Sequence, residues 1–181
     1  SFAFGMMLFI TCVLLASHEL VRILGTEEYK SSIFYIAPLV VSGYFAFLYN
    51  LPAQIEYYYG KTNYIAGGTC IAAILNIIMN YIGIKMFGSV AAAYTTLIIY
   101  IIYFMIHYYL AVKIHGTHLF RLLWLIIYAG VLILIATLSL ILRNVLAARW
   151  AMLAIVCIIG ALWADKEFGV FTVVKKRMKS H

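Results

Sequence analysis

Six long apolar stretches fill almost all of this chain of 181 residues. Hydrophobic residues make up 66% of the composition and charged residues only 10%. A soluble domain carries charge on roughly a quarter of its residues, and about 20 apolar residues suffice to carry a helix across a bilayer. The chain is therefore expected to lie in a membrane, where its few polar residues are the informative ones.

The interruptions between the stretches place six membrane spans. Backbone groups in lipid need internal hydrogen bonds, so the choice is between helices and a closed barrel. Continuous apolar runs such as residues 122–136 show no alternation with a period of two, which favours helices. We therefore predict one all-α, polytopic transmembrane helical bundle without a separate soluble domain. The predicted spans cover residues 2–24, 31–55, 63–84, 89–112, 120–142 and 145–164.

The net charge of +7 is spread over the connections between the spans and the end of the chain. If the spans alternate, the side that holds both ends carries more lysine and arginine, and the positive-inside rule predicts that this side is cytoplasmic. The basic tail at 175–179 then acts as a topology determinant that also contacts anionic lipid, and nucleic-acid binding is not expected. The chain opens at Ser1 without an initiator methionine, so we expect the back portion of a longer protein.

The first two spans carry polar residues near one end. Glu19 and Arg22 lie three residues apart, share a helix face and can form an ion pair. Such a pair inside a membrane is a functional candidate. The alternative is that this turn lies at headgroup depth, where a charged side chain has a low free-energy cost. Asn50 and Gln54 line one face of the second span, and Pro52 should kink it about one turn upstream. The kink indicates either the broken helix of a transporter or ordinary packing.

The third and fourth spans each carry one polar stripe. Asn76 and Asn80 lie on one face of the third span, where they either form interhelical hydrogen bonds or line a wet cavity. Tyr100, Tyr103 and His107 recur on one face of the fourth span, as a proton relay, a sugar-stacking surface or a structural stripe. The fifth and sixth spans hold almost nothing polar and are expected to face lipid or a lipid tail. Any polar pathway should therefore be built by the first four spans.

Catalytic and metal-binding patterns are weak in this chain. No Ser-His-Asp set is visible in the sequence, and the two histidines near residue 116 have no third ligand type close by. The three cysteines lie inside apolar runs without paired spacing, which is typical of packing residues. We therefore expect no enzyme activity, no cofactor and no metal.

Several segments resemble a transporter family. Residues 20–29, Leu-Val-Arg-Ile-Leu-Gly-Thr-Glu-Glu-Tyr, resemble the outer loop of polysaccharide flippases. Residues 76–80, the turn ending at Gly88, and residues 91–96 resemble their Asn-x-x-x-Asn…Gly…Gly-Ala-Ala-x-Ala-Thr signature, although the second glycine is missing. Residues 60–62, Gly-Lys-Thr, fit the short cytoplasmic loop between them. Over roughly residues 1–112, the chain thus resembles the C-terminal half of a Wzx-type oligosaccharide flippase of the MATE/MOP superfamily.

The resemblance implies a two-lobed transporter in the bacterial cytoplasmic membrane, with its C-terminus in the cytoplasm. Residues 1–112 would supply the later helices of the second lobe, residues 113–165 two additional lipid-facing helices, and residues 166–181 the basic cytoplasmic tail. Such proteins move undecaprenyl-diphosphate-linked oligosaccharide units across the membrane for surface polysaccharide biosynthesis. The implied partners are this lipid-linked substrate, membrane lipids, a missing N-terminal lobe and a glycan polymerase.

The polar spans suggest roles for particular residues in such a flippase. The arginine would attract the diphosphate, the amides would hold sugar hydroxyls and the tyrosines would stack on sugar rings. Glu19 or His107 would couple a proton gradient. Two alternatives are less favoured. A cation-coupled drug exporter would need a buried acid, and both Glu19 and Glu56 lie near span ends. A membrane-embedded glycan enzyme would need larger outer loops than the short connections between these spans. The expected substrate-binding residues are Arg22, Asn50, Gln54, Asn76, Asn80, Tyr100 and Tyr103.

Overall fold

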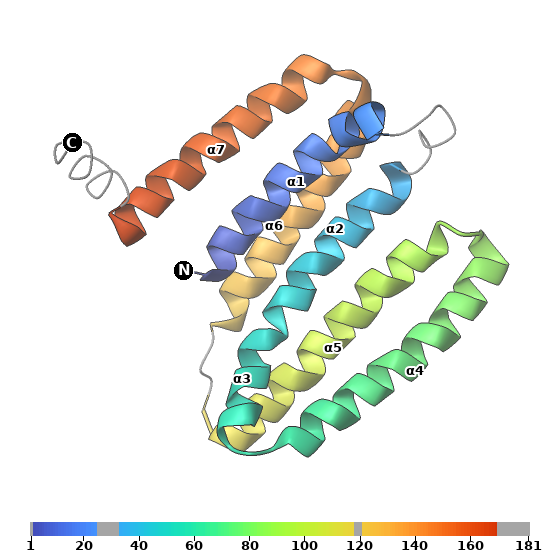
Figure 1. The fold of residues 1–181 in the computed structure, drawn as a ribbon, viewed down its shortest axis with the longest axis vertical. Coiled ribbons are helices and arrows are strands. Elements are labelled where there is room, and N and C mark those ends of the chain that lie inside the picture. The colour runs from blue at the N-terminus through green and yellow to red at the C-terminus, as the bar shows by residue number, and fades with distance from the viewer. Residues whose placement is uncertain (1, 25–32, 118–120, 170–181) are drawn as a thin grey trace.

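The computed structural model describes residues 2–24, 33–117 and 121–169, and these residues form helices joined by short connections, without a strand (Figure 1). The predicted loop at 25–29 and the basic tail at 175–179 lie outside the described residues. The helices are α1 (Phe2–Leu24), α2 (Ile33–Leu48), α3 (Asn50–Tyr58), α4 (Thr62–Phe87), α5 (Ala91–His115), α6 (Leu122–Ile141) and α7 (Leu146–Phe168), with a single 3₁₀ turn, η2 (Leu142–Asn144), before α7.

Within the described residues, six helices are long and apolar enough to cross a membrane. Helices α2 and α3 together form one of these spans, and each of the other five is a single helix. The all-α polytopic bundle predicted from the sequence is thereby confirmed, with span ends within a few residues of the predicted ones. The protein is a multi-pass membrane protein.

The second span is broken at Tyr49, between α2 and α3. Pro52 has no backbone N–H to donate to the carbonyl group one turn earlier, so the helix loses one hydrogen bond at this point. Neighbouring bonds persist, from Tyr49 N to Phe45 O at 3.0 Å and from Ala53 N to Tyr49 O at 3.1 Å. The Asn50 side chain donates to the carbonyl of Ala46 at 2.8 Å and stabilises the end of α2. The missing hydrogen bond lies where the sequence predicts a kink, and Tyr49 itself keeps right-handed helical backbone angles, with φ −64° and ψ −25°.

Helices α4 and α7 lie at opposite ends of the bundle, as Figure 1 shows. Helix α4 packs on α5 and the short α3, whereas α7 packs on α1 and η2. Between them, α5 packs on α2, α2 on α1, and α6 on both α1 and α2. The centre of the bundle is filled by apolar side chains from these four helices, among them Leu14, Tyr44, Phe104 and Leu132.

Helix α6, expected from the sequence to face lipid or a lipid tail, packs one of its faces into the bundle. One of its faces is buried against α1 and α2, because apolar and small residues recur every three or four positions along it. Helix α7 does expose most of its surface, but so does α4, which carries the amide stripe. The buried face of α6 consists of Leu125, Ala129, Leu132, Ala136 and Ser139.

Candidate functional site

A carboxylate and an imidazole meet in the interior of the bundle. Glu56 projects from α3 and His107 from α5, and His107 Nδ1 lies 2.8 Å from Glu56 Oε1. Neither side chain has any exposed surface. Burying ionisable groups is costly unless they are paired, so the packing of α3 on α5 depends on this contact.

Aromatic rings and a glycine enclose the pair. The Tyr103 ring lies one turn before His107 on α5 and meets the imidazole edge to face, with centroids 4.5 Å apart. Tyr49, at the break between α2 and α3, stacks on Tyr103 with centroids 4.5 Å apart. From α4, the Thr69 hydroxyl bonds the Tyr103 hydroxyl at 2.6 Å, and Gly68 lies directly against the imidazole. Four segments therefore close around one acid–histidine pair.

Two polar atoms of this pair have no hydrogen-bond partner among the residues that the structure describes. Glu56 Oε2 and His107 Nε2 are both buried and both unsatisfied. Leaving a buried acceptor or donor unpaired costs about 1–3 kcal/mol, and such groups in native structures call for an explanation such as a catalytic role, a water or an ion. The pair thus has unused capacity to bind a proton, a water or a small ion.

Glu56 and His107 differ in their distance from the ends of their helices. Glu56 lies near the end of its span at Tyr58, as the sequence indicated, yet it is fully buried. His107 is about 12 Å from the end of α5 at His115, at the helical rise of about 1.5 Å per residue. The expectation that an acid at this position would not be buried was wrong. Counting residues from the span end could not detect that α5 and α4 cover this position.

A second ion pair joins α1 to α7. Glu19 accepts two hydrogen bonds from Arg149, at 2.6 Å from Nη2 to Oε1 and 3.3 Å from Nη1 to Oε2. Arg149 is 2% exposed and Glu19 18% exposed, so the pair is largely withdrawn from solvent. This partner replaces the predicted one, Arg22, which lies exposed on the last turn of α1. The sixth span therefore carries a buried charge, contrary to the expectation that it holds almost nothing polar.

The amides of α4 join it to α5. Asn80 Nδ2 donates to Asn76 Oδ1 at 2.7 Å, and the Thr95 hydroxyl of α5 is shared between Asn80 Oδ1 and the carbonyls of Ala91 and Ala92 in its own helix. Close approach is possible because Gly83 faces Thr95 and Ala91 without a side chain of its own. Of the two interpretations left open by the sequence, interhelical hydrogen bonding fits these contacts.

A double-mutant cycle tests this assignment. Asn80→Ala and Thr95→Val should show a coupling energy of about 0.6 kcal/mol, as is typical of hydrogen bonds between membrane helices. The free energy of unfolding in detergent micelles would be measured, with Asn63→Ala, an exposed position at the start of the same helix, as the control. A coupling energy of zero would contradict the assignment and favour a cavity-lining role.

The remaining predicted substrate residues do not converge on one cavity. Asn50 and Gln54 are exposed on α3, and Asn50 is engaged with the α2 backbone. Tyr100 is half-buried on α5, and Tyr103 is buried and bonded to Thr69. Among the predicted residues, only Tyr103 and His107 lie together at the acid–histidine pair.

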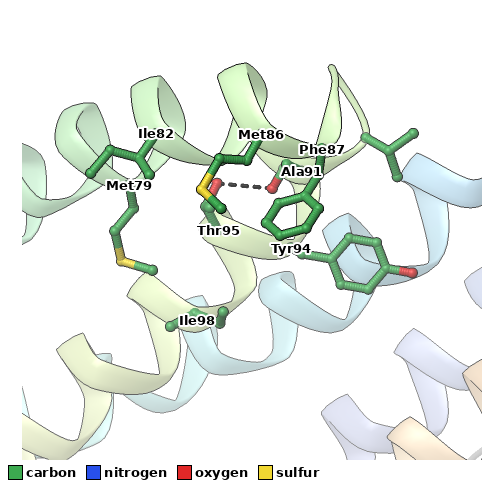
Figure 2. Close-up of a pocket in the computed structure, with 10 residues that line it drawn as sticks. Met79, Ile82, Met86, Phe87, Ala91, Tyr94, Thr95 and Ile98 are labelled. Atoms are coloured by element: carbon green, nitrogen blue, oxygen red, sulfur yellow. Dashed lines mark hydrogen bonds between the residues drawn. The ribbon is translucent and has the colours of Figure 1, made fainter.

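An open apolar cavity of about 470 Å³ lies between α4 and α5, near the turn that joins them. Figure 2 shows Met86 and Phe87 of α4 beside Tyr94 of α5, with the Thr95 hydroxyl bonded within its own helix. Within the described part of the chain, no acid, base or amide side chain lines this cavity. Its lining suits an apolar chain rather than a sugar or a phosphate.

Comparison with known proteins adds no further constraint. No protein-family model, no curated protein and no solved structure matches this chain. The resemblance to polysaccharide flippases therefore rests on the sequence segments described above.

Glu56 and Arg149 are the two charged residues that sequence reasoning missed; an acid one turn after Pro52 in an apolar span is the signal that could have identified Glu56.

Proposed function

We propose that this protein is a membrane transporter of the flippase type, which moves a lipid-linked oligosaccharide between the two leaflets. The proposal is supported by the Glu56–His107 pair, because ionisable groups held inside the membrane mark ion or substrate pathways. Glu56 also lies in a span in which Pro52 removes one backbone hydrogen bond, and proline-interrupted helices frame the binding sites of many transporters. The nature of the substrate rests on the resemblance of residues 20–29 and 76–96 to flippases.

A cation-coupled exporter of small apolar molecules is the second candidate. From the sequence it was disfavoured because no buried acid was expected, yet Glu56 is such an acid. The apolar cavity between α4 and α5 would suit its substrate. The two candidates share a coupling site and differ in cargo.

The decisive experiment uses cells that lack the gene. Lipid-linked oligosaccharide would be quantified, and the leaflet that holds it determined with a membrane-impermeant glycan probe. Accumulation in the cytoplasmic leaflet, reversed by the restored gene, is the expected result. Normal export accompanied by a changed tolerance to apolar drugs would overturn the flippase and favour the exporter.

Glu56→Gln should impair transport in the same assay. The substitution keeps the shape of the side chain but removes its ability to exchange a proton, and a loss of roughly 5- to 150-fold corresponds to typical coupling free energies. Glu167→Gln, an exposed acid near the end of α7, is the matched control and should export normally. Full export by Glu56→Gln, at an unchanged amount of protein in the membrane, would remove Glu56 from the mechanism.

A further inference from the structure

The contact between Gly68 and His107 leaves no room for a side chain at position 68 of α4. A Cβ atom at Gly68 would lie 2.8 Å from His107 Nε2 and 3.1 Å from Cε1. The imidazole cannot swing aside freely, because its other nitrogen is bonded to Glu56 and its face meets Tyr103. The backbone of α4 therefore covers the one nitrogen of His107 that has no partner.

The neighbouring glycine on α4 behaves differently. Nothing lies within 4 Å of a Cβ built at Gly67, although it occupies the adjacent position of the same helix. Close approach to α5 is thus required at Gly68 and not at Gly67. The two glycines form a matched pair for experiment.

We propose that Glu56 and His107 form a proton-binding site that is closed to water by α4 at Gly68 and opens when α4 separates from α5. With a carboxylate and a neutral imidazole the pair has a charge of −1; one proton bound from water gives a carboxylic acid whose O–H donates to the imidazole, and the pair then has a charge of zero. A dry site favours the state of zero net charge, because a buried unpaired charge is costly. Water admitted at Gly68 solvates the charged state, so the proton leaves to that water.

The other titratable groups that face the pair are two phenols. Tyr103 faces it from α5 and Tyr49 from the junction of α2 and α3. From α4 the facing residues are Gly68 and Thr69, which do not titrate. Lys61, at the turn before α4, is exposed. The proton exchange itself involves the carboxyl group and the imidazole.

This inference rests on the proposed function only for the use made of the proton, so it can be tested without transport. Infrared difference spectra of the protein in lipid nanodiscs, recorded between acidic and alkaline pH, should contain a carboxylic-acid C=O band. Glu56→Gln should lose that band and Glu167→Gln should keep it. His107→Gln should shift it, because the partner of the carboxyl group changes. Spectra in which no C=O band depends on Glu56 would overturn the proposal.

The role of α4 is tested by the rate at which the same band shifts after transfer to D₂O. Gly68→Ala should accelerate the shift severalfold, because the methyl group forces α4 away from the imidazole, whereas Gly67→Ala should match the wild type. If the band shifts in D₂O at the same rate in Gly68→Ala and Gly67→Ala, the proposal that α4 closes the site is overturned. The two proposals can fail separately. If the band depends on Glu56 but cells that lack the gene still export lipid-linked oligosaccharide, the proton site is supported and the flippase function is rejected.

Discussion

Arg149→Met is expected to lower the free energy of unfolding by about 3–5 kcal/mol, the usual cost of removing one partner from a buried ion pair. The Glu19 carboxylate would lose both of its hydrogen bonds from the guanidinium. It would remain between α1 and α7 at a position that is largely closed to solvent. Methionine retains an unbranched apolar stem, so the loss reports mainly the uncompensated charge rather than a cavity.

Unfolding in mixed detergent micelles measures this effect. Arg121→Met, an exposed arginine at the start of α6, is the matched control and should change stability by no more than about 0.5 kcal/mol. Glu19→Leu combined with Arg149→Met should recover most of the loss, since replacing both members of a buried pair is often neutral. A single Arg149→Met variant as stable as the wild type would show that the pair contributes nothing to the α1–α7 seam.

The membrane spans could be predicted because their signal is local. An apolar run long enough to cross a bilayer needs no knowledge of its neighbours, and the sixth predicted span, residues 145–164, corresponds to Leu146–Phe168. The break at Tyr49 was equally local, since Pro52 removes a specific backbone donor. Both features depend only on residues within one helix.

The contacts of the candidate site could not be predicted because they join distant helices. Glu19 was assigned to Arg22 on its own face, yet its partner Arg149 comes from the other end of the chain. Glu56 meets His107 only because α3 packs on α5, and neither residue carries a signal for that neighbour. Apolar spans show little amphipathic periodicity, so the sequence does not fix which face of each helix turns inward. The order of helices and their rotation determine the site.

Gly5→Ala is expected to destabilise the other end of the α1–α7 seam by about 1–3 kcal/mol, the usual cost of overpacking. A Cβ atom at Gly5 would lie 2.6 Å from Cη2 and 3.0 Å from Cζ3 of Trp163. The indole cannot simply rotate away, because Phe4 and Phe168 each pack against it with centroids 5.7 Å apart. Helix α7 therefore has to move as a whole to make room for the methyl group.

The same unfolding measurement serves, with Gly130→Ala on α6 as the control, since nothing lies within 4 Å of a Cβ there. The Cys12 and Cys157 thiols lie near each other, one on α1 and one on α7, so their oxidative cross-linking, detected by mass spectrometry of the peptides, should slow in Gly5→Ala. Gly5 and Glu19 are about 21 Å apart along α1. The changes in the free energy of unfolding caused by Gly5→Ala and Arg149→Met should therefore be additive. Unchanged cross-linking and stability in Gly5→Ala would mean that Trp163 does not fasten α7 to α1.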